Sequence, residues 1–180
     1  MDNQNLFYNL KITDTNKKCQ IGETVANQNM QAGIFPVLSC EGACIKGEIA
    51  RLVANMIAKE KPFKRACHGE LLSVPSSAMA KWLKESPKVV LVDGCFIRCH
   101  GRILENLIDN NHLIQFDALS IHKKYADKFE IDSVPETERI NTARYVADSI
   151  LDELNNPKIR TDNFKVGNVT CCSSVEKTND

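Results

Sequence analysis

Apolar residues follow two patterns along the chain, and together they predict alternating strands and helices. Continuous, largely β-branched runs are typical of strands that are buried on both faces of a parallel sheet. Apolar residues that recur every three or four positions indicate helices packed on such a sheet. The predicted strands lie at 34–39, 88–92 and 112–116, and the predicted helices at 46–60, 77–86, 95–110 and 136–154. We therefore expect an α/β protein with a mainly parallel sheet.

The same patterns divide the chain into three parts. Residues 1–33 are polar, and we expect them to be an irregular N-terminal extension. Residues 34–156 should form a single Rossmann-like α/β domain, whose sheet has four or five strands flanked by helices. Residues 157–180 read as a polar C-terminal tail. A chain of 180 residues is long enough for one domain with a full core.

Cysteines gather where the predicted elements begin or end. The chain has eight of them, and two C-x3-C pairs, Cys40 with Cys44 and Cys95 with Cys99, each stand between a strand and a helix. Cys67 lies at another boundary. Because the carboxyl ends of parallel strands meet at one edge of a sheet, we expect Cys40, Cys67 and Cys95 to lie close together there. Cys44 and Cys99 should follow one helical turn behind.

These motifs resemble those of a known family. Ser-Cys-Glu-Gly at 39–42, a later single cysteine, Val-Asp-Gly-Cys-x3-Cys at 92–99 and the KKYADKF segment at 123–129 are similar to the DGC-domain proteins, named for their Asp-Gly-Cys triplet. The resemblance runs over about 36–128 and implies a zinc-binding protein. The family's cysteines map onto Cys40, Cys67, Cys95 and Cys99.

Clustered thiolates suit more than one chemistry. Zinc accepts sulfur at about 2.3 Å in a tetrahedral site, and an iron-sulfur cluster fits four thiolates nearly as well. The alternative class is a thiol-redox enzyme, in which a low-pKa cysteine works with a resolving cysteine. Helix N-termini should lower the pKa of Cys40 and Cys95. The sequence leaves open whether the protein is an enzyme.

Residues beside the cysteines are weaker candidates. Cys44 departs from the family pattern, so a fifth thiol makes the ligand set ambiguous, and His68 is a further possible ligand. Asp93 is expected to cap the helix that follows it. We expect His100 to point into solvent and Cys19 to be a surface thiol.

A last pair of thiols, Cys171 and Cys172, lies in the polar tail. Adjacent cysteines do not easily form an unstrained disulfide, yet both sulfurs can bind a soft ion together with a third thiolate. We hypothesise that this pair captures a soft metal or metalloid and passes it to the cysteine cluster.

The charge balance and the hydropathy of the chain limit the classes of partner that we expect. Lys plus Arg and Asp plus Glu each total 23, which gives no electrostatic argument for nucleic acid or for an anionic membrane. The N-terminus has no basic region followed by a long apolar segment, so we expect no signal peptide and no membrane span. Reduced cysteines then predict a cytoplasmic protein whose partner is a metal ion or a soft metalloid.

Overall fold

Four parallel strands form the sheet in the part of the chain that the structure describes. The computed structural model describes residues 11–13 and 17–156. The strands are β1 (Phe35–Ser39), β2 (Phe63–Arg65), β3 (Val89–Asp93) and β4 (Leu113–Asp117), in the spatial order β2-β1-β3-β4. Every neighbouring pair is parallel. The predicted single α/β domain with a parallel sheet is therefore confirmed.

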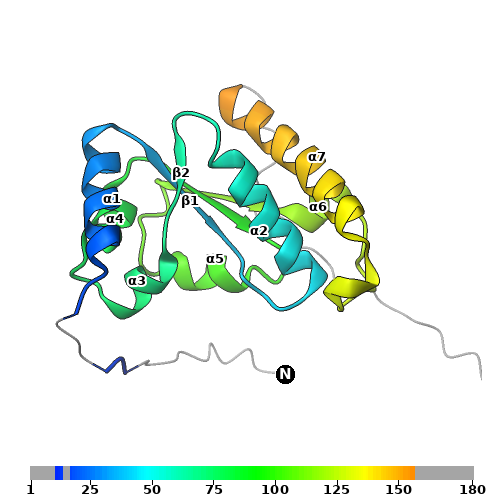
Figure 1. Cartoon of the computed structure of the whole chain (residues 1–180), viewed down its shortest axis with the longest axis horizontal. Coiled ribbons are helices and arrows are strands. Elements are labelled where there is room, and N and C mark those ends of the chain that lie inside the picture. The colour runs from blue at the N-terminus through cyan, green and yellow to red at the C-terminus, as the bar shows by residue number, and fades with distance from the viewer. Residues whose placement is uncertain (1–10, 14–16, 157–180) are drawn as a thin grey trace, which may run out of the picture.

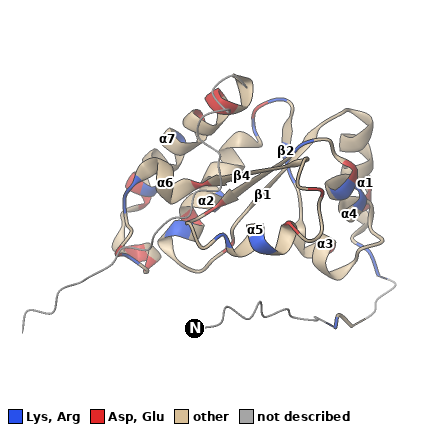
Figure 2. Ribbon diagram, turned by 180° about the vertical axis from the view of Figure 1, so that it is seen from behind, with Lys and Arg blue, Asp and Glu red and all other residues tan. Residues whose placement is uncertain are grey.

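Helices cover both faces of this sheet (Figure 1). One layer contains α1 (Gln20–Gln31), α3 (His68–Ser73), α4 (Ala78–Glu85) and α5 (Cys99–Leu104). The other contains α2 (Ile45–Ile57), α6 (Ala118–His122) and α7 (Glu136–Asn155), with the 3-10 helix η1 (Ile131–Ser133) before α7. None of the described helices is long and apolar enough to cross a membrane. Basic and acidic residues are interspersed along the elements (Figure 2).

Burial on both faces explains the continuous apolar run of β3. Val90 and Val92 pack into the core under α2 and α7, whereas Val89 and Leu91 pack into the opposite core under α1 and α4. All four side chains are fully buried. Alternate residues of a strand point to opposite faces. In a strand covered on both sides all of these side chains are buried, which favours apolar residues at every position.

The strand order creates a topological switch point at the carboxyl edge. From β1 the chain runs outward to β2, and it then returns to form β3 on the other side of β1. Between β1 and β3 the connections therefore leave in opposite directions, which is the usual ligand position in open α/β sheets. The backbone N–H of Cys40 donates to the Val92 carbonyl at 2.8 Å and holds the two strand ends together.

The expectation of an irregular N-terminal segment is wrong for α1. This helix is largely polar and Ala26 is its only buried residue, so its apolar periodicity is weak. Contacts with the rest of the protein hold it. The carboxylate of Glu23 accepts from the Ala78 N–H at 2.6 Å, at the start of α4, and the sulfur of Cys19 caps α1 by accepting from the Gly22 N–H at 3.3 Å.

The helix predicted at 95–110 is also shorter than expected. α5 begins only at Cys99, after Arg98 adopts a left-handed conformation with φ of 53°. Leu104 is buried, whereas Ile103 is 47% exposed. This late start decides the geometry of the site.

Candidate metal centre

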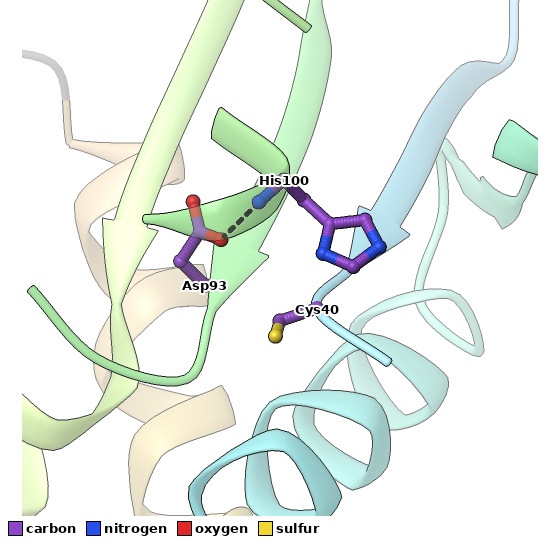
Figure 3. Close-up of side chains that lie close together, drawn as sticks. All are labelled: Cys40, Asp93 and His100. Carbon is purple, nitrogen blue, oxygen red and sulfur yellow. Dashed lines mark hydrogen bonds between the residues drawn. The ribbon is translucent and has the colours of Figure 1, made fainter. Parts of the chain in front are cut away.

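Three side chains meet at the switch point between β1 and β3 (Figure 3). Cys40 follows β1, Asp93 ends β3 and His100 lies in the first turn of α5. One ligand atom from each, the sulfur, a carboxylate oxygen and a ring nitrogen, lies within 4.8 Å of the other two. Cys40 and Asp93 are buried and His100 is half-buried. No other group of three Cys, His, Asp or Glu side chains in the described part of the chain is drawn together this closely.

Hydrogen bonds to the backbone fix the Asp93 side chain. Its two carboxylate oxygens accept from the N–H groups of His100 at 3.3 Å and Gly101 at 3.2 Å, which confirms that Asp93 caps the following helix. Burial raises the pKa of the Asp93 carboxyl, and these two hydrogen bonds oppose the rise. A metal cation would offset the cost of burying this charge.

The glycine of the Asp-Gly-Cys triplet is required by close packing. A Cβ added to Gly94 would lie 2.7 Å from the carbonyl carbon and oxygen of Lys46, in the first turn of α2. A Cβ on Gly47 would likewise collide with the backbone of Gly42 in the loop after β1. The two loops that carry Cys40 and Asp93 therefore pack against α2 through bare backbone, and a side chain at Gly94 would push them apart.

The expectation that His100 points into solvent is wrong. Because α5 starts at Cys99, His100 occupies its first turn and its ring extends toward the end of β1 (Figure 3). The ring also contacts the ring of His68 edge to face, with the centroids 4.8 Å apart. The Nδ1 atom of His100 is buried and has no hydrogen-bond partner, so this nitrogen is available as a ligand.

A family match agrees with this geometry. Residues 36–140, more than half of the chain, match the family model of the DGC domain. The chain belongs to the DGC-domain family. The match confirms the resemblance inferred from the Asp-Gly-Cys triplet and its neighbouring motifs. No curated protein and no solved structure matches the chain.

The DGC domain places its cysteines at the predicted edge but does not gather them at one point. Cys40, Cys67 and Cys95 follow β1, β2 and β3, as the parallel arrangement requires. Of the five cysteines at this edge, only Cys40 belongs to the group of close ligand atoms. Cys67 is an exposed residue at the N-cap of α3. Cys44 is the N-cap of α2, so its predicted position one helical turn behind Cys40 is wrong.

The pKa of the Cys95 thiol differs from the one that the sequence predicts. It lies in the turn before α5 and not in a first helical turn, so it lacks the stabilisation of thiolate that a helix N-terminus gives. Burial raises the pKa of the Cys95 thiol, a hydrogen bond from the backbone of Ile97 opposes the rise, and the charges of Asp117, Cys99 and Cys44 add to it. The predicted lowering of this pKa is wrong. At Cys95 the site therefore lacks the readily ionised thiol on which the redox alternative depends.

Two other predictions concern isolated thiols. Cys19 is exposed, as expected. Cys171 and Cys172 lie outside the described residues.

The sequence analysis did not anticipate that His100 would lie in the group of close ligand atoms, and it treated Asp93 as a helix cap alone. The signal was available in the spacing, because Asp93 lies in the family's motif at 92–99 and His100 directly follows the last cysteine of that motif.

The donor set fits a zinc ion. Zinc binds cysteine sulfur, histidine nitrogen and carboxylate oxygen at about 2.0–2.3 Å, which places tetrahedral ligands about 3.5 Å from one another. Ligand atoms within 4.8 Å therefore need only a small closure to bind. A cation would offset the energetic cost of burying two polar groups, the unpartnered Nδ1 of His100 and the carboxylate of Asp93.

Proposed function

We propose that this DGC-domain protein binds zinc through Cys40, Asp93 and His100. The observation that carries the proposal is the convergence of three zinc-type ligand atoms within 4.8 Å at the topological switch point of the sheet. Each ligand comes from a different element, so only the folded domain assembles the site. Zinc bound there would act as a Lewis acid toward a ligand that reaches it.

Zinc is favoured over an iron-sulfur cluster by the kind of donor atom. Iron-sulfur clusters are held mainly by four cysteine thiolates, and the close group contains one sulfur, one oxygen and one nitrogen. A borderline-soft ion such as zinc accepts all three. Magnesium and calcium prefer oxygen ligands throughout.

The proposed site has two alternative forms, one with three protein ligands and one with four. Three ligands would leave one position open, as in zinc enzymes, whereas a fourth thiolate would close a structural site. Cys67 is one candidate for a fourth ligand, because it precedes His68, whose ring contacts His100. Cys95 and Cys99 complete the ligand set implied by the family resemblance.

A reducing compartment such as the cytoplasm suits this function. All six cysteines in the described part of the chain are free thiols. Three of them, Cys19, Cys67 and Cys99, are exposed, where an oxidising environment would favour their pairing with other thiols. We therefore propose that the protein works where thiols stay reduced.

Zinc titration of single variants tests the site. Full-length protein is stripped of metal with a chelator, reloaded, and its affinity is measured in competition with a chromophoric chelator. Cys40→Ser, Asp93→Asn and His100→Ala should each weaken binding at least about 100-fold, because each removes a direct ligand. The matched control is Cys19→Ser, since Cys19 is an exposed thiol that caps α1. Unchanged affinity in His100→Ala and Asp93→Asn would contradict the proposed centre.

Cys67→Ser distinguishes the two forms of the site. A closed four-ligand centre should lose affinity in this variant as strongly as in Cys40→Ser. An open three-ligand centre should keep its affinity within a few-fold. Cys95→Ser and Cys99→Ser tested in the same way decide whether the wider cysteine set takes part.

A further inference from the structure

An open cavity flanks β2, the outer strand of the sheet. β2 stands at one end of the strand order, and α1 and α2 lie on either side of it (Figure 1). The cavity has a volume of about 660 Å³ and is lined by residues of α1, of β2 and of the C-terminal end of α2. This volume falls within the range of about 300–1,000 Å³ that is usual for small-molecule sites.

The cavity is separate from the proposed zinc centre. None of its lining residues belongs to the group of Cys40, Asp93 and His100. It lies where α2 ends, at the C-cap residue Ala58, whereas the zinc centre lies at the strand ends before α2 begins. A helix of 13 residues is about 20 Å long.

Positive charges gather around this cavity. Lys59, Lys64 and Arg65 line it, and no acidic residue does. In the described part of the chain, the side chains of Lys59 and Lys64 have neither an ion-pair nor a hydrogen-bond partner. Because the whole chain has a formal net charge of zero, this is a local excess of positive charge without a carboxylate to balance it.

Arg65 adds a partly buried charge with unused donors. Its guanidinium donates to the Val37 carbonyl at 3.4 Å and to the Glu41 carboxylate at 2.9 Å. A guanidinium has five N–H groups, so other donors remain for a ligand. Burial lowers the pKa of Arg65, and the charge of Glu41 opposes this change. A second anion would further offset the cost of burying the guanidinium.

Asn29 supplies an uncharged donor to the same cavity. This residue lies in the last turn of α1 and lines the cavity. Its Nδ2 atom is buried and has no hydrogen-bond partner among the described residues. A buried N–H group without a partner is costly, and a ligand oxygen would satisfy it. Cations and N–H groups both need an acceptor, so the lining selects an anion.

We propose that this cavity binds a small molecule that carries phosphate groups. The proposed contacts are Lys59, Lys64, Arg65 and Asn29. A phosphate group carries about two negative charges at neutral pH, and its oxygens are arranged tetrahedrally, so it can accept from donors that approach from different elements. The site goes beyond the proposed zinc centre and does not depend on it.

The rest of the cavity suits the organic part of such a molecule. The volume of about 660 Å³ leaves room beyond a phosphate group. Val25 and Ala58 also line it, and they offer apolar surface. The side-chain amide of Asn55, on α2, is a further polar contact at the lining.

Each lysine also has a simpler role, which the test must separate from binding. Lys59 follows the end of α2, where a positive charge interacts favourably with the helix dipole. A lysine on an outer strand such as Lys64 discourages association with other sheets. Neither role accounts for the unpartnered amide of Asn29 or for its place in the same cavity. Asn29 and the lysines are therefore changed separately.

Titration of the full-length protein with sodium tripolyphosphate tests the proposal. Calorimetry at about 0.15 M salt, where exposed charges more than about 8 Å apart are largely screened, should find one site. Replacing both lysines, Lys59→Gln with Lys64→Gln, should weaken binding at least about 100-fold. Asn29→Asp keeps the shape of the side chain but replaces the donor with a negative charge, and should weaken it at least about 10-fold. The matched control is Lys81→Gln with Lys84→Gln, two exposed lysines of α4, which should leave affinity within two-fold.

Two further titrations define the site and its ligand. Tripolyphosphate also binds metal ions, so His100→Ala is tested, and it should bind tripolyphosphate as the natural protein does. A large loss in that variant would place the probe at the metal centre and overturn the cavity site. Citrate should bind at least about 10-fold more weakly than tripolyphosphate, and equal binding would overturn phosphate as the ligand class.

Unchanged affinity in Asn29→Asp or in the double lysine variant would also refute the cavity site, as would the absence of binding to the natural protein. Zinc affinity should be the same in these variants as in the natural protein, which also shows that they are folded. A failure of the phosphate site would therefore leave the proposed zinc centre standing. A failure of zinc binding would leave the phosphate titrations unaffected.

Discussion

The imidazole rings of His68 and His100 meet edge to face, with their centroids 4.8 Å apart and their planes at 82°. His68 begins α3 and His100 lies in the first turn of α5, so the contact joins two helices at the carboxyl edge of the sheet. Burial lowers the pKa of His68, and the neighbouring His100 lowers it further. This arrangement suits a role in which the His68 ring orients His100, the proposed ligand, and does not itself bind the metal.

Substitution of His68 separates a supporting role from direct ligation. His68→Phe preserves an aromatic edge-to-face contact and should keep zinc affinity within about three-fold. His68→Ala removes the support and should lower affinity about 10- to 100-fold, as for other residues that orient a ligand. Competition with a chromophoric chelator measures both. Equal, large losses in the two variants would instead identify His68 as a ligand.

Gly94→Ala tests the packing that positions the proposed zinc centre. The added methyl group would lie 2.7 Å from the Lys46 carbonyl group, and this is backbone that cannot rotate away. Overpacking of this kind costs about 1–3 kcal/mol, so the free energy of unfolding in denaturant should fall by about that amount. Zinc affinity should fall with it, because the loop that carries Asp93 is displaced.

Gly69→Ala is the matched control for this substitution. A Cβ at Gly69 would meet only the Cys67 sulfur, at an ordinary 3.5 Å. Gly69 also lies inside α3, where alanine is the better helix former by about 0.5–1 kcal/mol. This variant should be as stable as the natural protein or slightly more so. If Gly94→Ala were equally harmless, close packing would not explain the glycine of the triplet.

The β3 strand and its carboxyl edge could be predicted from the sequence because their signals are local. The run 89–92 is apolar on both faces, and parallel strands necessarily place Cys40 and Cys95 at the same edge. The close ligand group could not be predicted in the same way. The start of α5 depends on the left-handed Arg98 and on the contact of Gly94 with α2, and no periodicity encodes either feature. α1 was missed because contacts with α4 hold it.

The family's KKYADKF segment is joined to α7 through Tyr125. Its hydroxyl donates to the Glu138 carboxylate at 2.5 Å and lies 3.2 Å from the Thr142 hydroxyl, and the residue is 9% exposed. Tyr125→Phe should reduce the free energy of unfolding by about 1–2 kcal/mol, because a hydrogen bond to a charged group is lost and the buried Thr142 hydroxyl loses a partner. Tyr145→Phe, on α7, is the control. Tyr145 is 60% exposed, so this substitution should change the free energy of unfolding by less than about 0.5 kcal/mol. Equal effects of the two changes would contradict the proposed anchoring role.

His122 should make stability depend on pH below neutrality. It is 7% exposed, its Nδ1 accepts from the Lys124 N–H at 2.9 Å, and its Nε2 is buried without a partner. Burial, together with the charge of Lys124, lowers its pKa from 6.5 to about 4. Between these values the unfolded chain binds the proton and the folded protein does not, so stability falls as the pH falls from about 6.5 to 4. The contribution lost is at most about 3 kcal/mol, at 1.36 kcal/mol per pH unit.

His122→Asn isolates this contribution, because asparagine keeps an acceptor for the Lys124 N–H and does not titrate. Metal-free protein is unfolded in urea at several pH values between 7 and 4, for the natural chain and for the variant. The difference between the two free energies of unfolding should grow in favour of the variant as the pH falls below 6.5. Subtracting one curve from the other removes the titration of Asp93 and Asp117, which both proteins share. Parallel curves across this range would show that His122 is protonated without cost in the folded protein, and its burial would then have no electrostatic consequence.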